Sequence, residues 1–379
     1  MPLMTKPLAL MTGAIAVVGA NSMVLAPITA AVARDLGGDP AEILQAAAAY
    51  GGTTALSALL LAPRADRIGP GPALMQALVL LLVSLVGSVL APDKWVLILF
   101  QAIGGLGAGM AIPAIYALAP ELGPEGEEKR SMGIVLSGWT LALVAGVAGS
   151  GFLAEWAGWR AVYLALLLCM SLLYVALRRT DLSVRTTGSA STPLTALRVP
   201  GIARGLMAAG LLMTGFYGTY AFIGAHVAEG LGRGTDAAGF VTLCYGVGFG
   251  LSSFLDRYLD RLPQHLAGAI SFAGLGLVYM AMAAGSGHFV LLSVLALFWG
   301  IVQHLGLNFV VSRLAGLDSS QRGAILGLNS SITYLAVLGG ALSFRLPYEA
   351  GGLAWCNLIS ASCCAIALIE CLAPRRVAI

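Results

Sequence analysis

The sequence predicts an all-α membrane protein with twelve transmembrane helices in two six-helix, pseudo-symmetric bundles. Three observations lead to this fold class. Of the 379 residues, 58% are hydrophobic and only 10% are charged, whereas soluble domains carry about 25% charged residues. The apolar residues form stretches of roughly 20 residues, the length that a helix needs to cross a bilayer. A polar stretch near the middle of the chain leaves six of these stretches on either side.

Twelve stretches have the length and composition of spans. Those before the polar stretch cover residues 8–31, 43–63, 71–91, 95–119, 132–154 and 158–177. Those after it cover residues 203–226, 237–255, 266–285, 288–311, 323–344 and 352–372. The first one also resembles a secretory signal, because Lys6 precedes an apolar run that ends in Ala-Val-Ala at 31–33. A run of about 24 residues is too long for the apolar core of a signal, so we interpret it as a membrane anchor.

Residues 178–200 separate the two halves of the chain. This stretch is basic and rich in Ser and Thr, a composition typical of a flexible linker. We therefore expect a first bundle over 1–177, a cytoplasmic linker over 178–200 and a second bundle over 201–379. Duplicated halves of this kind are the common plan of secondary transporters.

The basic residues predict the orientation of the chain in the membrane. With the N-terminus in the cytoplasm, 16 of the 21 Lys and Arg residues fall on the cytoplasmic side and five fall outside. Cytoplasmic loops carry the excess of Lys and Arg in membrane proteins. We expect a multi-pass protein of the inner membrane with both termini in the cytoplasm.

A short acidic-basic pair occurs at matching places in the two halves. Asp66 and Arg67 lie between the second and third predicted spans, and Asp256 and Arg257 lie between the eighth and ninth. The two pairs stand 190 residues apart, which is close to half of the chain. This spacing supports an internal repeat.

At these residues the sequence resembles the major facilitator superfamily. That family carries Gly-x-Leu-Ala-Asp-Arg-x-Gly followed by basic residues in this loop. Asp66, Arg67 and Gly69 match the pattern, whereas Ala62 stands at the first glycine and Pro-Gly-Pro follows Gly69. The resemblance implies the major facilitator fold and a cytoplasmic latch, in which Asp66 meets the positive end of a helix from the other half. Asp256 and Arg257 would belong to the second copy of this latch.

Two further motifs resemble the drug and sugar (arabinose-type) efflux branch of the same family. Span 132–154 is glycine-rich like the antiporter motif of that branch, although Val147 and Ala148 replace the expected proline, and Gly-Trp-Arg follows at 158–160. Gly138, Gly146 and Gly149 would form a face against which another helix packs closely, as small residues do in lipid. In span 95–119, Gln101 stands where the family has an arginine associated with proton transfer.

Ionisable side chains are scarce at membrane depth. None of the 18 acidic residues lies in the middle of a predicted span. His304 lies about nine residues from the cytoplasmic end of its span, or roughly 13 Å at 1.5 Å per residue. With an ordinary pKa of about 6.5, its imidazole is a candidate for proton coupling or solute contact. The alternative is a neutral histidine satisfied by a neighbouring helix.

Polar and aromatic residues in four spans are candidates for the solute site, because the corresponding helices line the cavity in the resembling family. They are Asn21, Gln101, Tyr217, Tyr220, Trp299, Gln303, His304 and Asn308. Such a lining carries no fixed charge and suits an uncharged polar or amphipathic solute. Each residue could instead hydrogen-bond between helices.

The sequence therefore predicts a secondary active transporter for a small organic solute such as a sugar, drug or metabolite. We expect efflux by alternating access, with proton coupling through His304 left open. Twelve Met and six Cys residues keep copper uptake as an alternative, since soft sulfur ligands suit monovalent copper. A channel or a non-transporting sensor is a further alternative.

An intramembrane enzyme is disfavoured by the sequence. The four histidines lie on separate segments, and no nucleophile stands beside a base in a known motif. We expect no catalytic residue, no cofactor, no bound metal and no nucleic-acid partner. The expected partners are the solute and membrane lipid, with the chain acting as a monomer.

Overall fold

The computed structural model describes residues 5–61, 68–124, 127–183, 193–255, 258, 261–318 and 321–372. The described residues form helices and connecting turns, and no strand occurs among them. Ten of these helices are long and apolar enough to cross a membrane, and the number is eleven if one bent pair counts as a single span. The helical class of the sequence prediction is thus confirmed, while the number twelve stays a prediction. The predicted span without a counterpart among these eleven is 237–255, which corresponds to α12, a helix of 17 residues.

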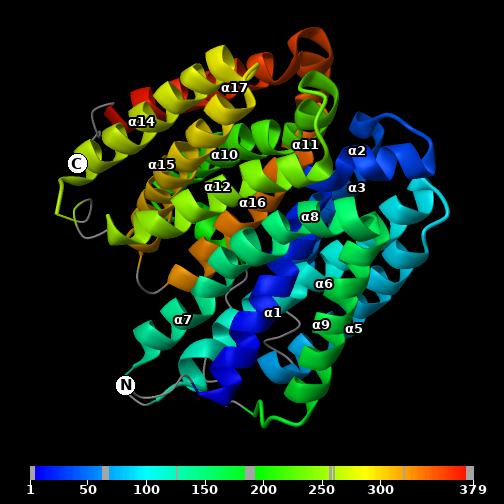
Figure 1. The fold of residues 1–379 in the computed structure, drawn as a ribbon. Helices are drawn as coiled ribbons and strands as arrows, with labels where there is room; N and C mark the ends of the chain where they lie inside the picture. The colour runs from blue at the N-terminus through cyan, green and yellow to red at the C-terminus, as the bar shows by residue number, and fades with distance from the viewer. Residues whose placement is uncertain are drawn as a thin grey trace.

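A first set of helices precedes the predicted linker (Figure 1). It contains α1 (Lys6–Met23), α2 (Leu25–Leu36), α3 (Pro40–Leu60), α5 (Pro70–Leu90), α6 (Lys94–Glu121), α7 (Glu128–Leu141), the π-helix η1 (Ala142–Val147), α8 (Ala148–Ala157) and α9 (Trp159–Arg178). The first expected span is the bent pair of α1 and α2, which meet at 51°. The expected span 132–154 is made of α7, η1 and α8 together.

A second set of helices begins inside the predicted linker, where residues 193–198 form η2. It contains η2 (Pro193–Arg198), α10 (Ile202–Tyr220), α11 (Ile223–Ala225), the π-helix η3 (His226–Gly230), α12 (Thr235–Leu251), η4 (Ser252–Phe254), α14 (Gln264–Gly285), α15 (Phe289–Ala315), α16 (Arg322–Ser343) and α17 (Arg345–Leu372). The last helix is kinked at Gly351 and Gly352, where Gly352 has φ 63°. The kink lies at the start of the expected span 352–372.

Local sequence explains where several helices begin. Asp39 and Glu42 form a capping box at the start of α3, with Pro40 in its first turn. Asp93 accepts hydrogen bonds from the backbone N–H groups of Trp95 (2.8 Å) and Val96 (3.0 Å) at the start of α6. Such caps satisfy N–H groups that have no partner within the helix.

The packing partners define a seam between the two sets. Within the first set, α6 packs against α3 and α5, and α1 packs against α7 and α9. Within the second set, α14 packs against α15 and α17, and α10 packs against α16 and α17. Across the sets, α3 packs against α16, α8 against α12 and α2 against α11. We call these three helix pairs the seam.

The Gly-Trp-Arg sequence at 158–160 ties three elements of the first set together. The Trp159 indole N–H donates to Asp35 Oδ2 at 3.0 Å, and Arg160 forms an ion pair with the same carboxylate. Arg160 Nη2 also donates to the carbonyl of Ala91 at 2.9 Å. Gly158 has φ 82°, a conformation that glycine adopts without strain. The motif therefore joins the start of α9 to the ends of α2 and α5.

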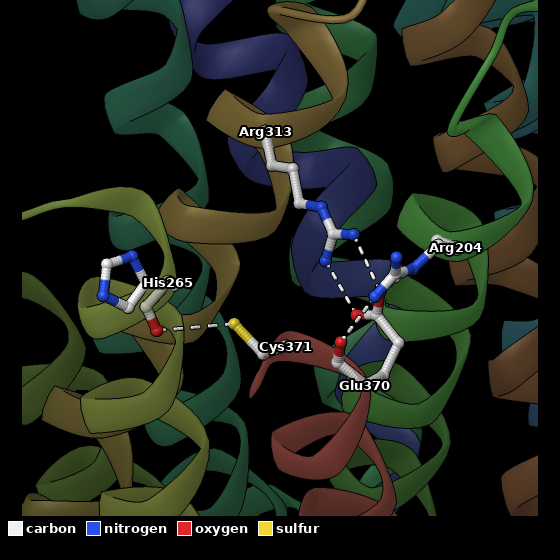
Figure 2. Close-up of polar contacts among 5 residues, drawn as sticks. All are labelled: Arg204, His265, Arg313, Glu370 and Cys371. Atoms are coloured by element: carbon white, nitrogen blue, oxygen red, sulfur yellow. Dashed lines mark hydrogen bonds and ion pairs between the residues drawn. The ribbon is translucent and has the colours of Figure 1, made fainter. Parts of the chain in front are cut away.

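A buried ion cluster ties three helices of the second set together (Figure 2). Arg313 of α15 donates to both carboxylate oxygens of Glu370 in α17, each at 2.8 Å. Arg204 of α10 donates to Glu370 Oε1 at 2.6 Å and to the Glu370 carbonyl at 2.8 Å. The Glu370 side chain is 5% exposed. A buried carboxylate is tolerated here because two guanidinium groups surround it.

This cluster yields a stability prediction. Glu370→Gln should destabilise the protein by about 3–5 kcal/mol, because it leaves buried guanidinium charge without its counter-ion. Thermal unfolding of the purified protein in detergent measures the effect. Glu349→Gln is the control, since Glu349 pairs with Arg345 one turn away on an exposed surface and should change little. Equal melting temperatures for the two variants would contradict a stabilising role for the cluster.

Candidate functional site

Polar side chains from both sets meet at the seam between α3 and α16. Tyr334 of α16 lies close to Tyr50 of α3, Tyr217 of α10 and Tyr116 of α6. Asn21 of α1 lies beside the Tyr50 hydroxyl. We call Asn21, Tyr50, Tyr217 and Tyr334 the seam cluster. Asn21, Tyr50 and Tyr334 are 3%, 1% and 5% exposed, and Tyr217 is half-buried.

A close approach of two helix backbones brings this cluster together. A Cβ atom on Gly51 would lie 2.6 Å from Val337 Cβ and 3.0 Å from the Tyr334 carbonyl oxygen. Only glycine leaves room for this contact, so α3 and α16 pack more closely there than larger residues permit. This contact brings Tyr50 of α3 and Tyr334 of α16 close together.

The polar atoms of the seam cluster are poorly satisfied. Within the described residues, the Tyr334 hydroxyl has no hydrogen-bond partner, and the Asn21 amide makes no well-formed hydrogen bond, with the Tyr50 hydroxyl as the polar group beside it. The Tyr50 hydroxyl donates to the Val18 carbonyl at the long distance of 3.4 Å. An unsatisfied buried polar group costs about 1–3 kcal/mol, so native structures rarely keep one without a reason. These groups are therefore candidates for binding a solute.

An aromatic pair extends the cluster within the first set. Trp139 donates its indole N–H to the Tyr116 hydroxyl at 2.8 Å, and its ring packs against Gly19 of α1. The seam cluster and this pair contain no charged side chain. The arrangement offers amide and hydroxyl hydrogen bonds beside aromatic surface, which matches an uncharged polar or amphipathic molecule better than an ion.

The structure places three residues of the predicted solute site beside the seam, in α1 and α10. Asn21 and Tyr217 belong to the seam cluster. Tyr220 donates its hydroxyl to the Met23 carbonyl at 3.2 Å, so it joins α10 to α1 across the two sets. Its ring stacks on Phe216 with centroids 5.3 Å apart.

Trp299 and Gln303 lie inside the second set. The Trp299 indole N–H donates to the Tyr279 hydroxyl at 3.0 Å, and its ring lies 4.7 Å from that of Tyr245. The side chain is fully buried. Gln303 is 2% exposed, and among the described residues its amide oxygen has no hydrogen-bond partner.

His304 and Asn308 continue along the same helix, α15. His304 is half-buried and meets the ring of Phe249 in α12 edge-on, with centroids 4.8 Å apart. Asn308 accepts a hydrogen bond from Ser312 at 3.2 Å. His304 therefore contacts α12 of its own set.

Gln101 is engaged away from the seam. Its amide nitrogen donates to the Ser88 hydroxyl at 3.0 Å, and the side chain is 2% exposed. This bond joins α6 to α5 inside the first set. Gln101 consequently acts as an interhelical contact, the alternative that the sequence left open for each candidate.

The predicted packing glycines have different surroundings. A Cβ on Gly138 would lie 2.5 Å from the Thr12 carbonyl oxygen, and one on Gly146 would lie 2.6 Å from Ala20 Cβ, so both face α1. Nothing lies within 4 Å of a Cβ on Gly149. Two residues further on, Gly151 packs against Gly239 of α12. The helix turns its small residues to two partners, and η1, which contains Gly146, lies between Gly138 and Gly151.

Most of the predicted latch lies outside the described residues. This applies to Asp66, Arg67, Asp256 and Arg257. Gly69 is described and precedes α5 with φ 90°, a backbone conformation that favours glycine.

The sequence prediction did not include Tyr50, Tyr116, Trp139 or Tyr334. Tyr334 had a visible signal, because it follows a run of polar residues from Asn329 to Thr333 in its span. Tyr50 directly precedes Gly51 and Gly52, and glycines in a span indicate close helix contact. Both signals were present, but neither indicates which helix is the partner.

Comparison with known proteins identifies the family. A family model described as Major Facilitator Superfamily matches residues 11–343. An uncharacterized MFS-type transporter, YwfA, of Bacillus subtilis is 26% identical over 355 residues, covering 91% of this chain and 86% of that protein. A probable sugar efflux transporter of Pasteurella multocida is 24% identical, covering 80% of this chain and 75% of that protein.

Solved structures share the fold. The D-xylose-proton symporter structure superposes with a TM-score of 0.75 at 17% identity, covering 96% of each chain. The human organic anion transporter MFSD10 gives a TM-score of 0.71 at 13% identity, covering 98% of this chain and all of that one. The family match extends over most of the sequence and agrees with the helical, apolar structure. The chain therefore belongs to the Major Facilitator Superfamily of membrane transporters.

Proposed function

We propose that the chain is a secondary active transporter that exports a small, uncharged polar or amphipathic organic solute by alternating access. The observation that carries the proposal is the seam cluster, where the Tyr334 hydroxyl is buried without a hydrogen-bond partner among the described residues and the buried Asn21 amide makes no well-formed hydrogen bond beside the Tyr50 hydroxyl. A hydroxyl-rich solute would satisfy these groups, and the efflux relative named for sugars supports this class.

The proposed architecture has twelve spans in two bundles, residues 1–177 and 201–379, joined by a cytoplasmic linker over 178–200. We place the protein in the inner membrane as a monomer with both termini in the cytoplasm. In this orientation the seam pairs α2/α11 and α8/α12 close the outer end. The latch made by Asp66, Arg67, Gly69, Asp256 and Arg257 would close the inner end. Rocking of the two bundles then exposes the seam cluster to each side in turn.

The solute prediction is tested by flux into proteoliposomes with a panel of sugars, neutral drugs and organic ions. We expect saturable flux for an uncharged hydroxylated solute and none for the ions. Conductance that does not saturate would favour a channel, and selective flux of copper would favour metal uptake.

Tyr334→Phe tests the seam cluster directly. It should raise the half-saturation concentration about 2- to 12-fold, because a neutral hydrogen bond is worth about 0.5–1.5 kcal/mol. Tyr163→Phe is a matched control, since the Tyr163 hydroxyl is also buried without a partner among the described residues but lies in α9, away from the seam. An unchanged half-saturation concentration for Tyr334→Phe would remove Tyr334 from the site.

His304 is the proposed group for proton coupling. If flux in the native protein responds to a pH gradient, His304→Gln should abolish that response while solute still raises the melting temperature. His265→Gln serves as the control, because His265 lies exposed at the start of α14. A pH response that persists in His304→Gln would assign the coupling to another group.

A further inference from the structure

The helix α12 begins without a cap of its own. Its N-cap residue is Gly234, which has no side chain to accept a hydrogen bond from the first turn. The first N–H groups of a helix have no partner within the helix and carry partial positive charge. An acceptor from elsewhere is therefore needed at this end of α12.

Glu155 supplies that acceptor across the seam. Its Oε2 accepts a hydrogen bond from the Thr235 N–H at 2.9 Å and a second one from the Thr235 hydroxyl at 2.7 Å. Glu155 belongs to α8 in the first set, and Thr235 is the first residue of α12 in the second. A Cβ atom on Gly234 would lie 2.9 Å from Glu155 Oε2, so the missing side chain leaves room for the carboxylate.

The backbones of α8 and α12 touch next to this bond. A Cβ on Gly151 would lie 2.5 Å from the Thr235 carbonyl oxygen and 2.6 Å from Gly239 Cα. A Cβ on Gly239 would lie 2.8 Å from the Ala148 carbonyl oxygen. The glycine contact thus holds the two helices at the distance at which the Glu155 carboxylate reaches Thr235.

The surroundings allow this contact to open. A cavity of about 490 Å³ adjoins it and is lined by residues of both sets, including Arg34, Glu155, Glu229 and Arg233. Thr235 is 3% exposed, whereas Glu155 is exposed on the cavity side. When the helices separate, water can replace the N–H and hydroxyl partners of the carboxylate. The free energy lost is then that of the charge-assisted contact between the Glu155 carboxylate and the two Thr235 donors.

We propose that Glu155 is a positioning residue of the transport cycle, whose carboxylate on the first turn of α12 holds this end of the seam shut until the two bundles rock. The inference rests on the proposed alternating access and adds a specific closing contact to it. The ionised carboxylate matters because it interacts with the positive end of the α12 dipole as well as with the two donors. Loss of the charge shifts the equilibrium toward the state open at this end.

The experiment measures access to the seam from each side of the membrane. The native cysteines are replaced, and a single reporter cysteine is introduced by Ser22→Cys, beside Asn21 in α1. A membrane-impermeant thiol reagent is added to one side of the membrane or the other, and the labelling rate of the reporter is measured. Glu155→Gln and Glu155→Ala should increase the labelling rate from the α8/α12 end at least fivefold and reduce it from the opposite end. Thr235→Val, which keeps the N–H donor, should give a smaller change in the same direction. Glu349→Gln is the control and should leave both rates unchanged.

The reciprocal change separates gating from loosening of the structure. If the labelling rate rises from both sides of the membrane in Glu155→Gln, the residue only stabilises the fold. If the labelling rates are unchanged, the contact does not hold the seam. Either result overturns the inference. Hydrogen exchange on the chain with its native cysteines gives a second readout. Exchange of the Thr235 amide should accelerate at least tenfold in Glu155→Ala while the start of α6, capped by Asp93, is unaffected.

Failure of this inference can be told apart from failure of the proposed function. Solute flux by the native protein with no effect of Glu155→Gln on access would refute the gating role alone. A reciprocal shift in access without flux of any tested solute would refute the proposed solute class and leave the gating role in place.

Discussion

The structure depends on one constraint: inside a bilayer, every backbone N–H and carbonyl group must find its hydrogen-bond partner within the protein. Helices meet this requirement, but lipid offers no hydrophobic force to press them together. Association must then come from close packing. Gly51 against Val337 and Gly151 against Gly239 show how the chain achieves this at the seam. The glycine contacts bring helix backbones near enough for polar side chains to meet.

The polar contacts are distributed according to their charge. Ionised groups form pairs near helix ends, as Glu370 does with Arg204 and Arg313 and as Asp35 does with Arg160. The seam cluster contains only amide and hydroxyl groups. Charges deep in a membrane are costly, so charged pairs stabilise the ends while neutral groups remain available in the interior. This division is the reason that we propose an uncharged solute.

The helices make contacts within each set and contacts across the seam. Contacts inside each set, such as Gln101 with Ser88 and Trp299 with Tyr279, do not cross it. The contacts that cross it include one at an exposed end, where Glu155 caps α12. The proposed alternating access requires that such contacts break while those within each set persist.

The sequence alone determined the helical class, the approximate spans and the scarcity of buried charge, because these follow from composition and from the length of apolar stretches. It also proposed Asn21 and Tyr217 as site residues, which stays a prediction. Tertiary structure decided the rest. Helical periodicity shows which residues share a face but not which helix that face meets, so the sequence could not show that Gln101 bonds to Ser88 of α5. Tyr50 and Tyr334, 284 positions apart in the chain, become neighbours only through the packing of α3 on α16.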